Sequence, residues 1–337
     1  MAPSLSLVAS GLRRAVAGAA LWVCALGLGS AGLSAFALGP PADPLPALDL
    51  REEVLRLPVT VRDARGRSET KSIAITHFRP PGDGPFPLVV MNHGRAVADK
   101  RAGQGRQRYE ALARYFVSKG FAVFVPTRLG YGDTYGDFDP EASGGCGVSR
   151  LPAVAQAASE QVLAAVALAA EQPWVDARHW FVMGGSVGGF TSLAVAARHP
   201  PGLIGAVNFS GGHGGRPDTH PGDPCGPRAI SSLWQKQAAT AHVPTLWLYW
   251  ENDRYWGAEW PVRWAEAWRE GGGQVEFHSL SAVGTDGHAG TRIDMARWVP
   301  LMETFLGGLG YTRPGLLARP NGPAARRREA ADLTRTD

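Results

Sequence analysis

The sequence predicts an α/β fold with a mostly parallel sheet and helices on both of its faces. Short apolar runs alternate with stretches of helical periodicity, which is typical of strand–helix–strand crossover units. Runs such as FPLVVMN and PTLWLYW are apolar throughout, as expected for strands buried on both faces. The chain has 337 residues, 45% of them hydrophobic and 19% charged. No Pro/Gly/Ser linker divides its middle, so we expect one large domain.

The N-terminal segment has the layout of a secretory signal. Arg13 and Arg14 precede the apolar, small-residue run AVAGAALWVCALGLGSAGLSAFA, which ends in Ala35-Phe36-Ala37. A positive region, an apolar region and a small-residue cleavage site predict a signal peptide over residues 1–37. The protein would then be exported, periplasmic or secreted, with no stable membrane association after cleavage. The alternative is an uncleaved membrane anchor.

After cleavage the chain would begin with a Pro-rich linker over residues 38–49, and a catalytic domain is expected over residues 50–312. Apolar and polar residues alternate on either side of ARGRSE, from Leu55 to His77. This pattern predicts an antiparallel hairpin at a sheet edge. RYEALARYFVSKG and the Ala-rich residues 149–172 predict helices. The remaining expected strands are FPLVVMN, FAVFVPT, HWFVMGG, IGAVNFS, PTLWLYW and QVEFHSL.

Three further helices are expected at GGFTSLAVAARH, EWPVRWAEAWREG and TRIDMARWVPLMETFLGGL. The rhythm breaks over residues 211–242, after the sixth strand. This insert is rich in Gly, Pro and His and then helical through AISSLWQKQAA, and we expect it to act as a lid over the carboxyl end of the sheet. We expect residues 313–337 to form a polar, disordered tail. The net charge of +4, to which the arginines of this tail contribute, does not favour nucleic-acid binding.

Two cysteines remain after removal of the leading segment, Cys146 and Cys225, each in a Gly/Pro-rich loop. In a chain bound for an oxidising compartment, an even pair predicts a disulfide. The alternative is two unpaired thiols. Neither cysteine has a neighbouring Cys or a well-spaced His pair, so no metal site is predicted.

The stretch GGSVGG places Ser186 between an apolar strand and a helix with many small residues. It matches G-x-S-x-G in the strand–turn–helix context that a nucleophile elbow requires. Gly184 and Gly188 are needed there because a side chain would collide with the neighbouring strand and helix. The alternative is a Gly-rich turn with an incidental serine.

A serine nucleophile needs a base that is itself oriented by an acid. Asp253 follows the strand PTLWLYW, with Glu251 as the main alternative acid, and His288 lies in the Gly-rich loop GTDGHAG ahead of the last helix. The order Ser186, Asp253, His288 is the order that this architecture requires. We assign Asp286, two residues before His288, to the loop.

The oxyanion of a tetrahedral intermediate needs hydrogen-bond donors. We expect the backbone N–H groups of Val187 and Arg95, with Gly94 allowing close approach. The Arg95 side chain is either a ligand for a substrate carboxylate or a solvated charge. Other candidates for the substrate pocket are His93, Gly94, Tyr131, Tyr255 and Trp256, although aromatic residues more often pack in the core. His213 and His220 lie in the insert, where they either contact substrate or belong to a loop.

The motifs HGR, GGSVGG, ENDRYWG and GTDGH together resemble the α/β-hydrolase superfamily, in its dienelactone-hydrolase-like and prolyl-oligopeptidase-like branch. The resemblance covers about residues 50–310. It implies an eight-stranded sheet, the roles given above to Ser186, Asp253 and His288, and no cofactor. Dienelactone hydrolases carry Cys as the nucleophile, so Ser186 favours a general carboxylic-ester hydrolase acting on a small-molecule ester. The alternatives are a small peptidase or amidase with the same triad, and a non-catalytic binding protein.

Overall fold

The computed structural model describes residues 45–96, 98–144, 146 and 150–311, all of which belong to one compact unit. The predicted signal peptide, most of the Pro-rich linker and the predicted C-terminal tail lie outside the described residues. At the junction of the linker and the catalytic domain, Leu48–Leu50 forms a short 3-10 turn.

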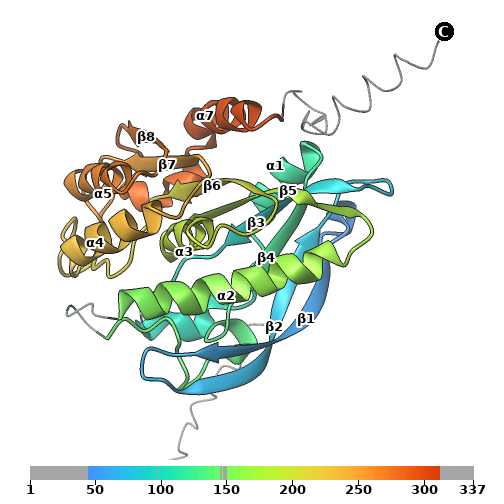
Figure 1. The fold of residues 1–337 in the computed structure, drawn as a ribbon, viewed down its shortest axis with the longest axis horizontal. Helices are drawn as coiled ribbons and strands as arrows, with labels where there is room; N and C mark the ends of the chain where they lie inside the picture. Colours follow the sequence, from blue (N-terminus) through green and yellow to red (C-terminus); the bar gives the residue numbers. More distant parts are fainter. Residues whose placement is uncertain (1–44, 97, 145, 147–149, 312–337) are drawn as a thin grey trace, which may run out of the picture. The chain divides into compact units, whose positions relative to one another are not determined.

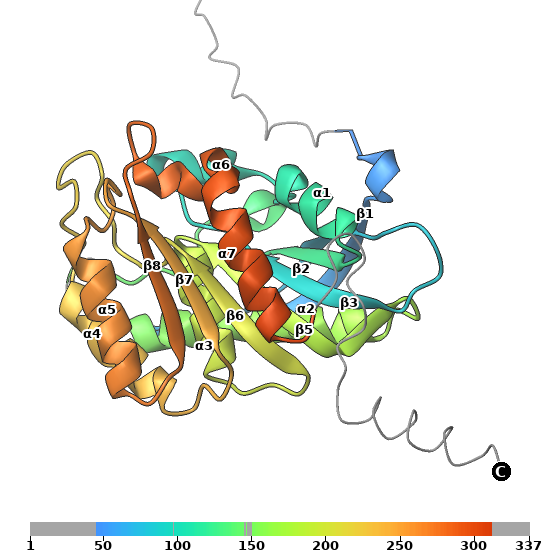
Figure 2. The ribbon, with the colours of Figure 1, turned by 90° about the horizontal axis from the view of Figure 1, so that it is seen from above.

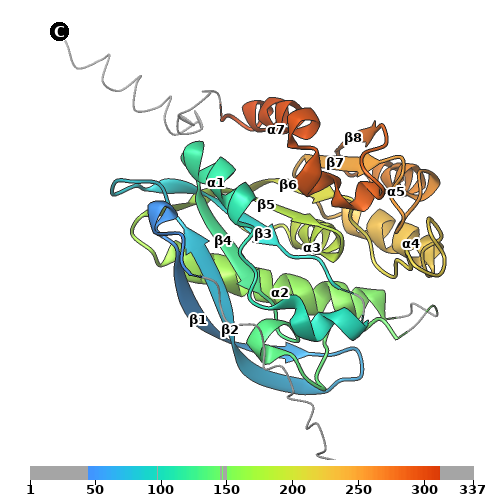
Figure 3. The same cartoon turned by 180° about the vertical axis from the view of Figure 1, so that it is seen from behind.

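The sheet has eight strands in the order β1-β2-β4-β3-β5-β6-β7-β8. Strands β1 and β2 form the predicted antiparallel edge hairpin, and β2 also runs antiparallel to β4. All other neighbours are parallel, so the expected mostly parallel sheet is confirmed. Figure 3 shows the long β1–β2 hairpin at the opposite end of the sheet from β8. The strands are β1 (Glu53–Arg62), β2 (Ser68–Phe78), β3 (Phe86–Asn92), β4 (Ala122–Thr127), β5 (Val175–Gly185), β6 (Leu203–Phe209), β7 (Thr245–Trp250) and β8 (Val275–Leu280).

Helices cover both faces of the sheet, as predicted (Figures 1 and 2). Alternate residues of each strand point to opposite faces, so a strand that is apolar throughout feeds two cores. In β7, Trp247 and Tyr249 join the core under α2 to α5, whereas Leu246 and Leu248 join the core under α1 and α7. The helices are α1 (Glu110–Ser118), α2 (Leu151–Ala170), α3 (Val187–Ala196), α4 (Pro227–Ala238), α5 (Glu259–Glu270), α6 (Gly290–Ile293) and α7 (Met295–Gly308).

The insert that the sequence predicts as a lid, residues 211–242, has two parts. Its second half contains α4, which completes the crossover between β6 and β7 within the helical layer. Trp234 of α4 is fully buried and packs against Trp247 of β7 and Trp264 of α5, with ring centroids 5.0 and 5.3 Å away. This apolar face holds the helix against the sheet, so only residues 211–225 form a loop at the carboxyl edge.

The last predicted helix is also interrupted. It is divided into α6 and α7 at Asp294, which has φ −129° and ψ 34°. The Asp294 carboxylate accepts hydrogen bonds from Trp250 Nε1 at 2.6 Å and Arg297 Nε at 2.8 Å. These bonds stabilise the non-helical backbone at this position and place α6 beside the carboxyl ends of β7 and β8.

Helix α2 is long and apolar enough to cross a membrane by length and composition alone. Half of its apolar window is buried against the rest of the protein, however. Val154, Val162 and Ala165 belong to the core beneath the sheet, so α2 is a layer helix of this fold.

Candidate active site

Ser186 lies at the turn from β5 to α3 with φ 58° and ψ −128°, a strained conformation for a residue that has a side chain. The turn depends on glycine. A Cβ on Gly188 would lie 2.0 Å from the carbonyl oxygen of Asn92, and one on Gly184 would lie 2.4 Å from Gly188. The sequence-based interpretation of GGSVGG as a tight strand–turn–helix junction therefore agrees with the backbone. The hydroxyl stands at the N-terminus of α3, where the helix dipole favours negative charge.

Asp253 and His288 meet from the loops that follow β7 and β8. The Nδ1 atom of His288 lies 3.1 and 3.0 Å from the two carboxylate oxygens of Asp253. Asp253 is buried, and its Oδ1 also accepts hydrogen bonds from the backbone N–H groups of Tyr255 and Trp256 at 2.8 and 3.3 Å. The alternative acid, Glu251, is exposed.

Asp286 has the loop role that its position suggests. Its side chain accepts hydrogen bonds from the backbone N–H groups of Arg254 at 3.0 Å and His288 at 2.9 Å. It therefore joins the loop after β7 to the loop after β8 and fixes the backbone that carries His288.

Ser186 and His288 line the same cavity, which has a volume of about 390 Å³. In the part of the chain that the structure describes, no direct hydrogen bond joins their side chains. The cavity lies between β3, β5, the start of α1 and the α6–α7 segment. Its walls are mainly apolar, from Met91, Tyr109, Ala111, Leu112, Met183 and Met295, with Glu110, Thr291 and Arg292 among the polar lining residues.

The loop after β3 passes close to Ser186 at Gly94. A Cβ on Gly94 would lie 3.2 Å from Ser186 Cβ. The Gly94 N–H donates to the Tyr109 hydroxyl at 3.2 Å, and the Ala96 N–H donates to Gln104 Oε1 at 3.0 Å. Among the described residues, the N–H groups of Arg95 and Val187 have no acceptor. These are the two amides that the sequence predicts for an oxyanion.

His93 is fully buried beneath this loop and does not line the cavity. Its Nε2 accepts a hydrogen bond from the Arg128 backbone N–H at 3.0 Å, so Nδ1 carries the proton and donates to the Gly94 carbonyl at 2.8 Å. Burial, assisted by the nearby Arg128 charge, lowers the pKa of His93 to about 3. The ring is therefore neutral and supports the backbone of the Gly94 loop.

The Arg95 side chain is neither a free ligand for a carboxylate nor a solvated charge. It donates to both carboxylate oxygens of Asp139, at 3.0 and 2.5 Å, and to the Tyr131 hydroxyl at 3.0 Å. Burial alone would lower the pKa of Arg95, but its bonds to Asp139 raise it above the ordinary value. Both alternatives for this side chain are corrected, because the sequence does not reveal a partner so far along the chain.

Of the five pocket candidates, only Gly94 lines the cavity that contains Ser186. Tyr131 and Trp256 are buried in the protein, and Trp256 Nε1 donates to the Ser210 carbonyl at 2.6 Å. Tyr255 stacks on His288 and borders a second, polar cavity with Lys100, Asp218, Arg254 and Asp286 among its lining residues. The three candidates His93, Tyr131 and Trp256 are therefore structural.

Sequence reasoning missed the residues that build most of the cavity wall, at the start of α1 and in the α6–α7 segment. Three of the five methionines of the chain, Met91, Met183 and Met295, line the cavity. Methionine is flexible and suits adaptable apolar surfaces, so the methionines within two expected strands and one expected helix are a signal that points to this wall.

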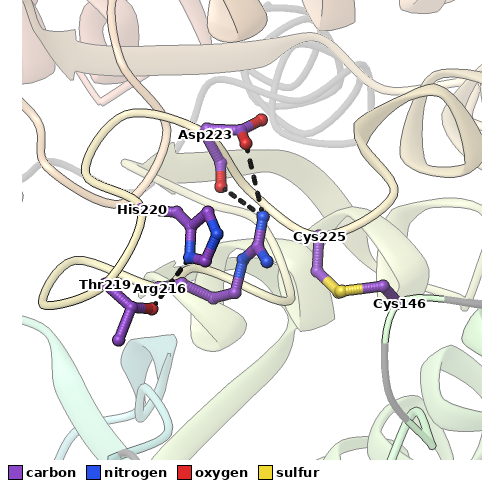
Figure 4. Close-up of a disulfide and its surroundings, with 6 residues drawn as sticks. All are labelled: Cys146, Arg216, Thr219, His220, Asp223 and Cys225. Atoms are coloured by element: carbon purple, nitrogen blue, oxygen red, sulfur yellow. Dashed lines mark hydrogen bonds and ion pairs between the residues drawn. A yellow bond between two sulfur atoms is a disulfide. The ribbon is translucent and has the colours of Figure 1, made fainter. Parts of the chain in front are cut away.

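The predicted disulfide is present between Cys146 and Cys225, whose Cα atoms are 4.8 Å apart (Figure 4). Near it, Arg216 pairs with Asp223 at 3.3 Å, and the Nδ1 atom of the His220 ring lies 3.0 Å from the Thr219 hydroxyl (Figure 4). His213 is buried, and its Nε2 lies 3.3 Å from the Glu141 carbonyl. Neither His213 nor His220 lines the cavity of Ser186.

Comparison with solved structures finds the same fold. The acylaminoacyl peptidase of Pyrococcus horikoshii matches with a TM-score of 0.51 at 11% identity, over 81% of this chain and 44% of that one. The dipeptidyl peptidase 4 of Porphyromonas gingivalis matches with a TM-score of 0.48 at 12% identity, over 75% of this chain and 35% of that one. The chain thus spans less than half the length of both peptidases. A Klebsiella pneumoniae protein provisionally assigned as a dienelactone hydrolase gives 0.45 and 17%, over 68% and 85% of the two chains.

A search of curated protein sequences finds no match. Residues 69–256 match the X-Pro dipeptidyl-peptidase (S15) family. This match covers more than half of the chain and includes Ser186 and Asp253, while His288 lies beyond it. The expected relationship to the α/β-hydrolase superfamily is confirmed. The chain belongs to the X-Pro dipeptidyl-peptidase (S15) family of α/β-fold serine hydrolases.

Proposed function

We propose that the protein hydrolyses carboxylic esters of apolar acids through an acyl-enzyme on Ser186. The observation that carries this proposal is the mainly apolar cavity of about 390 Å³ that Ser186 and His288 line together. When an apolar acyl group occupies this cavity, its carbonyl carbon lies next to the hydroxyl of Ser186 and close to the loop that carries the Arg95 amide.

In the proposed reaction, His288 Nε2 takes the proton of Ser186 Oγ as Oγ attacks the carbonyl carbon. The Asp253 carboxylate orients the imidazole through Nδ1 and stabilises its cation. The N–H groups of Val187 and Arg95 donate to the oxyanion. His288 then protonates the departing alcohol oxygen, which leaves the acyl group on Ser186. Water, deprotonated by His288, attacks the acyl-enzyme and releases the acid.

A second candidate is cleavage of peptide bonds, which the family match favours. Recognition of a peptide amine requires a carboxylate that is free to bind an ammonium group. Of the described residues that line this cavity, Glu110 is the one with a carboxylate. It already pairs with Arg114 at 3.1 Å and Arg108 at 3.4 Å. This pairing and the apolar wall favour esters of uncharged acyl groups over peptides with a free amine.

Matched substrates separate the two candidates. We would compare p-nitrophenyl hexanoate, hexanoyl p-nitroanilide and the p-nitroanilide of an X-Pro dipeptide, with wild type and Ser186→Ala. The proposal expects rapid turnover of the ester, little of either anilide, and loss of ester turnover in Ser186→Ala with an unchanged circular dichroism spectrum. Preferred cleavage of the X-Pro anilide would establish the second candidate instead. Ester turnover that persists in Ser186→Ala would refute the role of Ser186.

We further propose that the enzyme is exported and cleaved after Ala37. The layout of residues 1–37 and the Cys146–Cys225 disulfide support this location, because disulfides form and persist in oxidising compartments. Mass spectrometry of the protein recovered outside the cytoplasm should give Leu38 as the first residue. A chain that retains the full apolar segment and fractionates with membranes would indicate an anchor.

A further inference from the structure

A buried group of polar side chains that the proposed mechanism does not use lies beneath the His93–Arg95 loop. It consists of Arg128, Tyr131, Asp139 and Glu141, together with the Arg95 guanidinium. Arg128, Tyr131 and Glu141 are completely buried. Burying charges is costly unless they are paired, so a group of this size needs a physical reason.

One branch of this group controls His93. Glu141 accepts hydrogen bonds from Arg128 Nε at 2.5 Å and from Arg128 Nη2 at 3.2 Å. The same Nη2 donates to the His93 carbonyl at 3.0 Å, and the Arg128 backbone N–H donates to the His93 ring. Glu141 therefore orients Arg128, and Arg128 holds His93 at both its ring and its backbone.

The other branch controls Arg95. Asp139 binds the Arg95 guanidinium through both of its oxygens and also pairs with Arg101. The Tyr131 hydroxyl joins the two branches, because it accepts from Arg95 Nη1 at 3.0 Å and donates to Glu141 at 2.6 Å. The loop is thus held from below at His93 and Arg95, the two residues that flank Gly94, whose backbone passes close to Ser186.

The pairing within this group stabilises the ionised form of Glu141. Burial alone would raise the pKa of Glu141, but the paired Arg128 lowers it to about 2, so the carboxylate is ionised at neutral pH.

The segment that carries Asp139 and Glu141 is joined covalently at Cys146 to Cys225. Cys225 follows the loop in which the Gly212 N–H donates to the Ser186 carbonyl at 3.2 Å, and its own N–H donates to the Gly214 carbonyl at 2.9 Å.

We propose that Asp139 and Glu141 are positioning residues that aim the Arg95 N–H at the oxyanion, and that the Cys146–Cys225 disulfide anchors the segment that carries them. This inference rests on the proposed function. Asp139 and Glu141 touch neither the cavity nor the reacting atoms, so they act only through the backbone of residues 93–95.

This role has a kinetic signature. A misdirected oxyanion donor weakens binding of the transition state while leaving the acyl cavity intact, so kcat falls and KM changes little. Complete removal of one such donor costs about 10²- to 10³-fold in kcat in other serine hydrolases. Loss of a positioning residue should cost less, about 10- to 100-fold.

The test compares Glu141→Gln and Asp139→Asn with the control Asp176→Asn. Asp176 is also a buried carboxylate paired with an arginine, Arg178, but it lies at the start of β5, at the opposite end of that strand from Ser186. For each variant we would measure the melting temperature, kcat and KM for p-nitrophenyl hexanoate, and the Ki of a hexyl trifluoromethyl ketone, whose adduct with the serine carries an oxyanion. Tyr131→Phe removes only the bridging hydroxyl and serves where a charge variant does not fold.

We expect Glu141→Gln, Asp139→Asn and Tyr131→Phe to lower kcat and to raise the ketone Ki by similar factors, with KM within about 3-fold of wild type. Asp176→Asn should lower the melting temperature without lowering kcat or raising the ketone Ki. The double variant Cys146→Ser/Cys225→Ser should lower kcat at unchanged KM. The inference is overturned if the variants differ from Asp176→Asn only in stability, or if kcat and ketone affinity do not change together. If wild type shows no turnover that depends on Ser186, the proposed function fails, and the inference fails with it.

Discussion

The phenol ring of Tyr255 is stacked on the imidazole of His288, with ring centroids 3.8 Å apart and planes inclined by 19°. The Tyr255 backbone N–H donates to Asp253 at 2.8 Å. The loop after β7 therefore supplies both the carboxylate that binds Nδ1 of the imidazole and the ring that covers its face. Together they restrict the imidazole to one orientation.

The first prediction concerns this stacked ring. Tyr255→Ala should lower kcat for p-nitrophenyl esters about 10-fold, because His288 then samples orientations that do not reach Ser186. Tyr255→Phe keeps the ring and should retain most of the activity. Steady-state kinetics of the two variants decide the point. Equal losses in both variants would attribute the effect to the hydroxyl and contradict the stacking argument.

The second prediction concerns the space between Gly94 and Ser186. In Gly94→Ala the new Cβ lies 3.2 Å from Ser186 Cβ and 3.3 Å from the Gly185 carbonyl, which is closer than ordinary contact. We expect kcat to fall at least 10-fold, because the loop and the serine must move apart. Gly103→Ala is the matched control, because its Cβ meets nothing within 4 Å. The account is contradicted if both variants keep wild-type kcat.

The third prediction concerns the shape of the apolar cavity. Ala111 is exposed at the start of α1 and lines the cavity, so Ala111→Trp adds volume there without disturbing the core. The variant should lose kcat/KM on p-nitrophenyl octanoate by about 10-fold more than on p-nitrophenyl acetate. Ala170→Trp, at the exposed end of α2, should leave the ratio unchanged. A uniform loss on both esters would place the acyl group elsewhere.

The fourth prediction concerns the pH dependence of stability. Burial lowers the pKa of His213 to about 4, from an ordinary value near 6.5. At pH values between these two pKa values, His213 is protonated in the unfolded chain but neutral in the folded protein. The free energy of unfolding therefore falls as the pH falls. From pH 6.5 to pH 5 this group alone should cost ~2 kcal/mol.

Urea unfolding of wild type and His213→Gln at pH 7 and pH 5 checks the fourth prediction, with the disulfide kept oxidised in both proteins. The variant should lose less stability than wild type between the two pH values. His93 supplies a similar dependence in both proteins and does not enter the difference. An identical pH dependence would show that His213 is protonated to the same extent in both states.

The strands and the Ser186 turn were predictable from the sequence because each depends on local chemistry. Continuous apolar runs become parallel strands, and the glycines around Ser186 are needed where backbones approach within contact distance. The chain order of Ser186, Asp253 and His288 follows from the topology, which fixes where strands end.

The cavity wall and the buried charges were not predictable in the same way. The wall forms where the start of α1 meets Met295, and two helices so far apart in sequence leave no local signal. The pairing of Arg95 with Asp139 likewise spans 44 positions. The sequence predicts a lid over residues 211–242, but α4 within this insert packs in the helical layer, because Trp234 fits the space between β7 and α5, a contact that composition does not reveal.

The most direct test of the central claim is covalent labelling of the folded protein by a fluorophosphonate, followed by peptide mass spectrometry. Wild type should carry one phosphonyl group, on Ser186, because the proposed mechanism requires His288 to activate this hydroxyl. Ser186→Ala and His288→Ala should remain unlabelled at the same probe concentration. Labelling at any other residue, or labelling of His288→Ala at the wild-type rate, would contradict the account.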